Sequence, residues 1–114
     1  MAEDRKEFQR RLKAFKDAFD AENWDKAIKL GEAIRAEFPN SFDADGWNTK
    51  NLAGAYNNRG NSYNELKQYE RAIEDLNKAI EIEPEDAEAY YNRGDSYNKL
   101  KQYERAIQDF DKAI

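Results

Sequence analysis

The sequence repeats itself with a period of 34 residues, and this feature constrains the fold more than any other. Residues 53–80 align with residues 87–114 without a gap. The two stretches differ at seven pairs of positions: Gly54/Glu88, Asn57/Tyr91, Asn61/Asp95, Glu65/Lys99, Glu74/Gln108, Leu76/Phe110 and Asn77/Asp111. A fixed period of this length indicates a duplicated supersecondary unit that buries its apolar face against its neighbours.

Each copy has the spacing of two helices. Tyr56, Gly60 and Tyr63 recur at intervals of four and three residues, which places them on one face of a first helix. The small and apolar residues of a second helix are Ala72, Leu76, Ala79 and Ile80. Residues 66–69 form a short connection, so each copy is predicted to be two antiparallel helices joined by a tight turn.

Residues between and within the copies predict how the helices end and pack. Pro84 should end the second helix, because proline disfavours helix in the preceding residue and has no N–H to donate. Asp86 then stands where a side-chain oxygen can cap the next helix. Glycine within a helix costs about 1 kcal/mol relative to alanine, so Gly60 and Gly94 are expected where the paired helix approaches closely.

These residues resemble the pattern of the tetratricopeptide repeat family. The matching residues are Tyr56, Arg59, Gly60, Tyr63, Ala72, Leu76, Ala79 and Pro84, then Tyr90, Arg93, Gly94, Tyr97, Ala106, Phe110 and Ala113. Arg59 and Arg93 replace the usual leucine; we expect their alkyl stems to cover apolar surface while the guanidinium groups reach water. The resemblance implies an all-α fold, a right-handed α-α superhelix (TPR solenoid) of about three helical hairpins, the first diverged and the last truncated.

The N-terminal third resembles a diverged copy of the unit. Residues 24–28 echo residues 69–73, and Lys16 stands where the first helix would have its glycine. The first hairpin is therefore expected to pack differently in detail. The predicted single domain divides into a diverged first repeat (1–41), an insertion (42–52), a second repeat (53–86) and an incomplete third repeat (87–114).

The insertion combines loop-forming and apolar residues. Asp43, Asp45 and Gly46 favour a loop, and the helix after it is expected to begin near Thr49 or earlier. Phe42 and Trp47 either fill the seam between repeats or, for tryptophan, anchor a partner. A calcium-binding loop is not expected, because no bidentate glutamate stands at its end.

Composition argues against several classes of function. The net charge of −5 and the pI near 4.9 do not suit a nucleic-acid partner, which would meet a basic face. Histidine and cysteine are absent from the sequence, which removes the commonest metal ligand, the usual general base and thiolate zinc sites. No segment reaches the roughly 20 apolar residues of a membrane span, and the N-terminus lacks the apolar run of a signal peptide. We therefore expect a cytoplasmic protein with no membrane partner, cofactor or metal.

Carboxylates are abundant, but the sequence gives none of them a catalytic setting. The carboxylates at outward helix positions or in turns are expected to be solvated: Asp17, Asp20, Glu22, Asp25, Glu74, Asp75 and Glu81. A catalytic carboxylate needs burial or a strong partner to shift its pKa. The chain is therefore not expected to be an enzyme.

The family resemblance instead implies a protein-interaction scaffold or adaptor. In such proteins the first helices line a concave groove that binds extended or helical peptides. The residues expected to line it here are Asn57, Asn58, Asn61, Asn64, Glu65, Tyr91, Asn92, Asp95, Asn98 and Lys99. Asparagine amides can donate to and accept from a peptide backbone. The alternative is that these are merely soluble surface positions copied by the duplication.

The charges of this set favour a neutral or basic peptide partner. Glu65 and Asp95 would attract such a peptide by charge complementarity. Some relatives clamp a terminal carboxylate of heat-shock chaperones with lysine and arginine. The corresponding positions here hold Asn57, Asn58, Tyr91 and Asn92, so that clamp is not expected.

A second hypothesis concerns the C-terminal flank. The sequence stops at Ile114, and Tyr97, Ile107 and Phe110 are expected to be partly exposed there. A contiguous apolar patch often marks association. The chain could therefore be a self-assembling structural module, a homo-oligomer formed through this flank.

Overall fold

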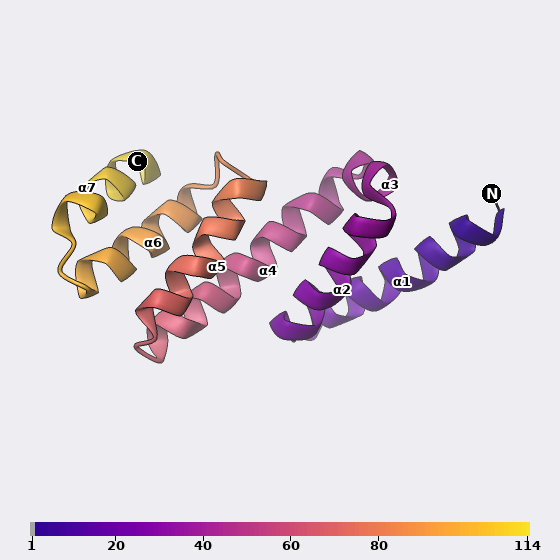
Figure 1. The fold of residues 1–114 in the computed structure, drawn as a ribbon, viewed down its shortest axis with the longest axis horizontal. Coiled ribbons are helices and arrows are strands. Elements are labelled where there is room, and N and C mark those ends of the chain that lie inside the picture. Colours follow the sequence, from indigo (N-terminus) through magenta and orange to yellow (C-terminus); the bar gives the residue numbers. More distant parts are fainter. Residues whose placement is uncertain (1) are drawn as a thin grey trace. The chain divides into compact units, whose positions relative to one another are not determined.

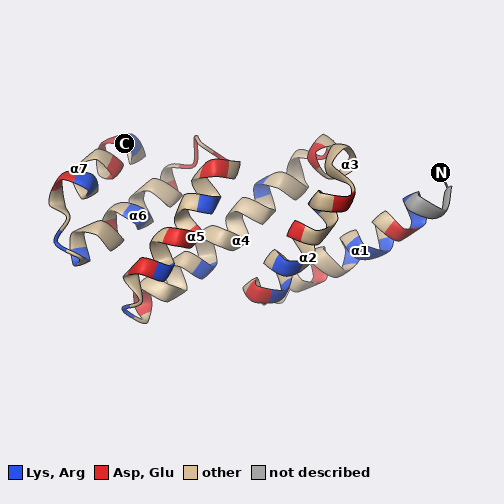
Figure 2. Ribbon diagram, in the orientation of Figure 1, with Lys and Arg blue, Asp and Glu red and all other residues tan. Residues whose placement is uncertain are grey.

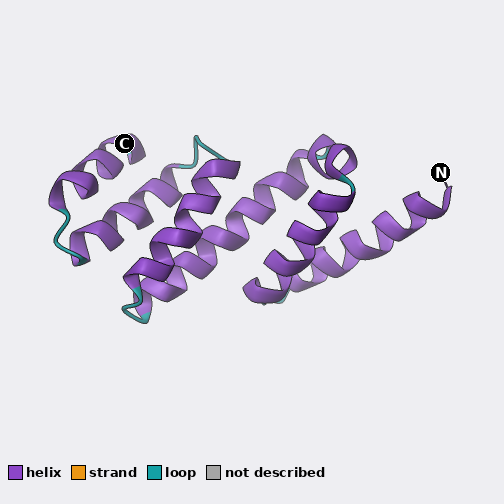
Figure 3. Cartoon of the chain, viewed as in Figure 1, coloured by secondary structure: helices purple, strands orange, loops and turns teal. Residues whose placement is uncertain are grey.

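The computed structural model describes the backbone of residues 2–114 and the side chains from Arg5 onward. Within this range the chain is helical and contains no strand (Figures 1 and 3). Its helices are α1 (Ala2–Asp20), α2 (Trp24–Glu37), α3 (Pro39–Ala44), α4 (Gly46–Glu65), α5 (Tyr69–Ile82), α6 (Ala87–Lys99) and α7 (Tyr103–Ala113). None of these helices is long and apolar enough to cross a lipid bilayer.

The helices belong to two compact units, Met1–Ala55 and Tyr56–Ile114, and α4 runs from the first into the second. The second unit contains the duplicated sequence. Its hairpins turn in the same way: the Gln68 N–H donates to the Tyr63 carbonyl at 2.8 Å, and the Gln102 N–H donates to the Tyr97 carbonyl at 2.8 Å. The lysine before each glutamine has a positive φ, of 61° and 64°. The predicted pairs of helices joined by tight turns are therefore present in both copies.

The boundary between the two hairpins follows the predicted signals. α5 ends at Ile82, two residues before Pro84. The Asp86 side chain accepts a hydrogen bond from the Glu88 N–H at 3.1 Å and so caps α6. The prediction that these two residues end one helix and begin the next is confirmed.

Gly60 and Gly94 lie where the two helices of a hairpin approach closely. A Cβ on Gly60 would lie 2.9 Å from Cγ of Leu76 and 3.3 Å from the Ala72 carbonyl oxygen. A Cβ on Gly94 would lie 2.8 Å from Cε1 of Phe110. Real Cβ atoms do not approach other atoms this closely, so the prediction that glycine permits the close approach is confirmed.

An arginine–aspartate pair fastens each hairpin and corrects two predictions. Arg59 donates from Nε and Nη2 to the Asp75 carboxylate at 2.7 and 2.8 Å, and Arg93 donates to Asp109 at 2.8 Å from the same two atoms. Asp75 is only 5% exposed and Asp109 only 3%. The predictions that Asp75 is solvated and that both guanidinium groups turn to water are therefore wrong.

The physical reason is that a bidentate guanidinium offsets much of the cost of burying a carboxylate. The pKa of Arg93 is raised, chiefly because it donates a hydrogen bond to Asp109. Both buried carboxylates are engaged by arginine, so neither is available as a general base.

The first unit is held together by aromatic and aliphatic side chains. Phe15, Ile34, Phe42 and Leu52 are fully buried. Its close-packed glycine is on α2: a Cβ on Gly31 would lie 2.8 Å from Cδ1 of Leu52 and 3.0 Å from Cε1 of Phe15. The close-packed glycine of this hairpin therefore lies on its second helix, whereas in the two duplicated hairpins it lies on the first.

The loop predicted at residues 43–46 is wrong. Pro39–Ala44 form α3, and only Asp45 separates it from α4. Pro39 begins α3, because its fixed φ suits the first helical turn and its missing N–H is not needed there. The Asp45 carboxylate accepts from the Trp47 N–H at 2.9 Å, at the start of α4. The early start predicted for α4 is confirmed.

Phe42 and Trp47 have different surroundings. Phe42 is fully buried, with its ring centroid 5.8 Å from that of Phe15. Trp47 is 38% exposed and its ring lies 6.1 Å from Phe15 and 5.9 Å from Phe19. Phe42 therefore belongs to the core of the first unit, and of the two only Trp47 is accessible to a partner.

Candidate peptide-binding surface

The ten residues predicted to line a groove do not share one environment. All lie on α4 or α6, as expected for first helices. Three are buried, Asn57, Asn64 and Asn92. Two are half-buried, Asn58 and Asp95, and five are exposed, Asn61, Glu65, Tyr91, Asn98 and Lys99. The set therefore divides into a buried and an accessible group.

The three buried asparagines form a hydrogen-bonded seam between α4 and α6. Asn92 Nδ2 donates to Asn57 Oδ1 at 2.9 Å, and Asn64 Nδ2 donates to the Asn92 carbonyl at 3.1 Å. The Ser96 hydroxyl donates to Asn64 Oδ1 at 2.5 Å. The expectation that these amides face an open groove is wrong, because they satisfy one another inside the second unit. Leaving one such buried group unpaired would cost about 1–3 kcal/mol.

Four accessible residues form what we call the first-helix row: Asn61, Glu65, Asp95 and Lys99. Asn61 and Asp95 are equivalent across the 34-residue period, as are Glu65 and Lys99. None of the four has a side-chain hydrogen bond or ion pair with another described residue. Both pairs differ in charge between the copies, so the two hairpins present different chemistry along this row.

α4 is polar but sparsely charged, as Figure 2 shows beside the more highly charged α5. α4 carries three charged residues in 20, whereas α5 carries six in 14. Amides and hydroxyls therefore dominate the surface of α4. Such a surface suits hydrogen bonding to a backbone better than binding of a strongly charged ligand.

Tyr91 is the equivalent of Asn57 in the second copy, but its side chain makes different contacts. It is 59% exposed, and its ring centroid lies 5.6 Å from that of Phe110. Asn57, by contrast, accepts a hydrogen bond inside the seam. Tyr91 therefore lies over the larger aromatic residue that replaces Leu76 in the last hairpin.

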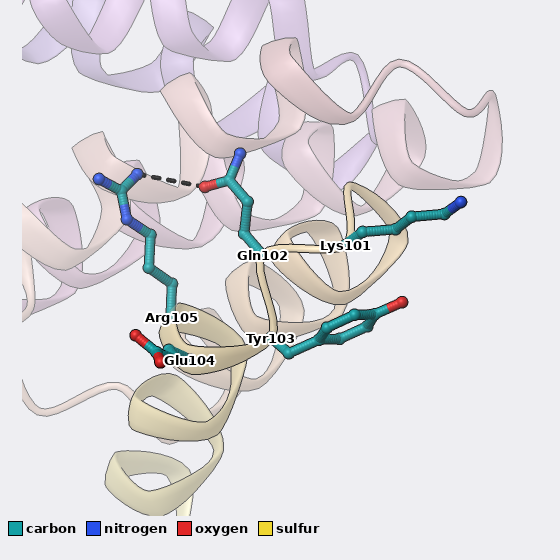
Figure 4. A pocket seen from close by; sticks show the side chains of 5 residues that line it. All are labelled: Lys101, Gln102, Tyr103, Glu104 and Arg105. Carbon is teal, nitrogen blue, oxygen red and sulfur yellow. Dashed lines mark hydrogen bonds between the residues drawn. The ribbon is translucent and has the colours of Figure 1, made fainter.

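Two surface hollows lie away from the first-helix row. One, of about 490 Å³, is lined by residues of α4 and α5 that include Tyr56, Arg59 and Lys78. The other, of about 460 Å³, surrounds the turn between α6 and α7 from Lys101 to Arg105 (Figure 4). None of the ten predicted residues lines either hollow.

Sequence reasoning missed the Arg59–Asp75 and Arg93–Asp109 pairs, although the sequence carries a signal for them. Both arginines and both aspartates are unchanged between the copies, whereas the neighbouring Glu74 becomes Gln108. Identity at a charged position beside a variable one indicates a fixed partner.

Comparison with known proteins agrees with this architecture. The family model described as TPR repeat, the tetratricopeptide repeat, matches residues 60–101. No curated protein matches the sequence.

Solved structures with the same fold include three similar chains. The Arabidopsis OM64 TPR domain is 24% identical, with a TM-score of 0.51, over 93% of this chain and 78% of that one. MamA is 24% identical, with a TM-score of 0.55, over 87% of this chain and 52% of that one, so this chain spans about half its length. The second TPR of Spaghetti (RPAP3), bound to the HSP90 peptide SRMEEVD, is 22% identical, with a TM-score of 0.53, over 97% and 95%.

The predicted all-α solenoid fold is therefore confirmed. Gly60, Gly94, the turn at residues 66–69 and Pro84 all lie in the region that the family model matches. Residues 60–101 thus match the tetratricopeptide repeat model, and the chain has the fold of solved tetratricopeptide repeat domains.

Proposed function

We propose that this chain is a protein-interaction module that binds a peptide segment of a partner protein along the first-helix row. The proposal rests on the lack of internal partners for four side chains, Asn61, Glu65, Asp95 and Lys99. These polar side chains lie on two successive first helices and have no side-chain partner among the described residues. Polar groups without an internal hydrogen bond or ion pair can bind a ligand without first breaking contacts within the protein.

The contrast with the buried asparagines supports this assignment. Asn57, Asn64 and Asn92 are already satisfied by one another or by Ser96. These three amides therefore serve packing within the second unit. The first-helix row differs between the two copies. Such a difference is expected of a surface whose two halves bind different parts of one ligand.

Charge complementarity favours a neutral or basic peptide. The row has two carboxylates, on Glu65 and Asp95, and one ammonium group, on Lys99. The HSP90 peptide SRMEEVD bound by the second TPR of Spaghetti is acidic. Like charges across an interface suppress the wrong partner, so this peptide should bind the present chain poorly.

A displayed library of random peptides, probed with the full chain, tests the proposal. We expect the selected peptides to be neutral or basic. A synthetic peptide from the selection should then bind the double variant Asn61→Ala/Asp95→Ala at least about tenfold more weakly, since roughly 1.4 kcal/mol of lost hydrogen bonding is a factor of ten. Isothermal titration measures the affinity, and circular dichroism checks that helicity is unchanged.

The matched control is Glu70→Ala/Glu104→Ala, which removes two equivalent exposed side chains from the second helices. This control should leave the affinity unchanged. Selection of acidic peptides, tight binding of SRMEEVD, or equal affinity of the row variant and the control would each contradict the proposal.

A further inference from the structure

The first-helix row ends in opposite charges on its two helices. Glu65 is the last residue of α4, and Lys99 is the last residue of α6. The two positions are equivalent across the 34-residue period, and both side chains are exposed. Neither has a side-chain hydrogen bond or ion pair with another described residue. A ligand that lies along the row therefore meets a carboxylate on one helix and an ammonium group on the next.

Only one of these two charges suits the end of a helix. The unpaired carbonyl groups of the last turn carry partial negative charge, so a cation stabilises that end and an anion destabilises it. Lys99 is the basic residue in the last turn of α6, whereas the last turn of α4 has no basic residue. Lys67 and Lys101 follow the two helices at equivalent turn positions, so they do not account for the difference. Glu65 therefore lowers the stability of its own helix, and local rules of this kind are broken mainly at functional sites.

Hydrogen bonds between α4 and α6 hold the two charges on neighbouring helices. The Ser96 hydroxyl donates to Asn64 Oδ1 at 2.5 Å, and Asn64 Nδ2 donates to the Asn92 carbonyl at 3.1 Å. Asn64 directly precedes Glu65, and Ser96 lies about one turn before Lys99. Helices in contact lie about 8–10 Å apart. An extended peptide that crosses both helices covers this distance in about three residues, at roughly 3.3 Å each.

The residues one turn earlier leave this polarity in place. Asp95 precedes Lys99 on α6 and forms no ion pair with it, and Asn61 precedes Glu65 on α4. With these residues included, the α6 half of the row is neutral and the α4 half is negative. The side-chain oxygens of Asn61 and Asp95 can accept hydrogen bonds from peptide N–H groups. The difference in charge between the two halves is therefore available to orient a ligand.

We propose that Glu65 and Lys99 set the polarity of the bound peptide. The ligand carries a lysine or arginine beside Glu65 and a carboxylate beside Lys99, about three residues away along an extended chain. This inference rests on the proposed peptide-binding function and names the ligand that the first-helix row prefers. The ligand cation supplies the positive charge that the end of α4 lacks, so binding offsets the cost of Glu65. The ligand carboxylate pairs with an ammonium group that has no other partner among the described residues.

Exchanging the two charges of the protein tests this polarity. The probes are one peptide from the selection described above and a second synthetic peptide in which its cationic and acidic residues exchange places. The wild type should bind the first peptide about tenfold more tightly, because both contacts turn from attraction to repulsion in the second. Glu65→Lys/Lys99→Glu, which keeps the net charge, should reverse the preference in isothermal titration. The preference should shrink in about 1 M salt, which screens charges beyond roughly 3 Å.

The matched control is Lys78→Glu/Glu81→Lys, which exchanges an exposed ion pair of α5 and also keeps the net charge. This variant should keep the wild-type preference. A measurement without ligand tests the cost of Glu65 separately. Glu65→Lys should raise the urea midpoint of unfolding and Lys99→Glu should lower it, because each changes the charge at the end of a helix.

The outcomes separate this inference from the proposed function. If Asn61→Ala/Asp95→Ala weakens binding while Glu65→Lys/Lys99→Glu keeps the wild-type preference, the polarity is overturned and the proposed function stands. Selected peptides that lack a cation and a carboxylate at this spacing, or a lower urea midpoint for Glu65→Lys, would overturn the polarity as well. If the library yields no binding peptide, the proposed function fails and this inference fails with it.

Discussion

The two units build helical hairpins with different side-chain chemistry. The first unit contains both tryptophans and five of the six phenylalanines of the chain, whereas the second contains all seven tyrosines. In the first, rings pack on rings: Phe15 contacts Phe42 and Trp47, and Phe19 contacts Trp24. The hairpin architecture therefore does not depend on one particular kind of core.

In the second unit, by contrast, tyrosine rings lie close to the guanidinium groups of arginines. The Tyr63 ring centroid lies 5.8 Å from the guanidinium carbons of both Arg59 and Arg71. Tyr97 has the same relation to Arg93 and Arg105, at 5.8 and 5.6 Å. Directional polar contacts are thus repeated with the period of the sequence. The duplicated unit therefore repeats the same polar contacts in both hairpins, whereas the first unit packs mainly ring on ring and joins its helices by different ion pairs, Arg11–Glu37 and Arg35–Asp43.

Truncating Phe15 should have the largest effect on the first unit. Phe15→Ala is expected to lower the free energy of unfolding by about 3–5 kcal/mol, because it leaves a cavity against Phe42 and beside Gly31. Urea unfolding followed by tryptophan fluorescence measures this change, since Trp24 and Trp47 are both in the first unit. A loss below about 1 kcal/mol would show that the aromatic cluster is not the core.

Removing a buried carboxylate should have the largest polar effect on the second unit. Asp75→Ala is expected to cost about 2–3 kcal/mol, because it leaves Arg59 without its bidentate partner. Arg59 retains some exposure to water, which keeps the loss below that for a fully buried pair. Urea unfolding followed by circular dichroism gives the value. The neighbouring exposed Glu74→Ala should change stability by less than about 0.5 kcal/mol, and similar losses from the two variants would refute the pairing.

The smallest expected effect is a gain in stability in the first unit. Asn48 is fully buried, and its Oδ1 has no hydrogen-bond partner among the described residues. Asn48→Leu, of similar shape, is expected to raise the free energy of unfolding by less than about 1 kcal/mol, because it removes that unsatisfied acceptor but also the long hydrogen bond, 3.4 Å, from Asn48 Nδ2 to the Phe42 carbonyl. The urea midpoint should rise with an unchanged slope. A fall in the midpoint would mean that polar groups at this position stabilise the first unit.

Features that depend on local sequence were predictable. The turn at residues 66–69 and the cap at Asp86 each follow from residues near one another in the sequence. The close approach at Gly60 joins two helices, but a glycine inside a helix already indicates it. Pro39 shows the limit of local reasoning. By comparison with Pro84 it marks the end of a helix, but it also begins α3, because proline fits both positions.

Polar contacts between helices were not predictable. Arg59 and Asp75 lie 16 residues apart, on different helices, and helical periodicity says nothing about such a pair. The same holds for Asn57 and Asn92, whose burial depends on how α4 and α6 face each other. Spacing placed all ten predicted residues on first helices, but only the packing separates those that support the fold from those free to bind.

The sorting of asparagines into a buried seam and an accessible row is the claim on which the functional proposal depends. Hydrogen exchange of the side-chain amides, followed by nuclear magnetic resonance, tests it directly. The amide groups of Asn64 and Asn92, which donate within the second unit, should exchange about 100-fold more slowly than that of the exposed Asn61, a factor that corresponds to a local opening free energy of roughly 2.7 kcal/mol. Equal exchange rates for the three side chains would contradict the account.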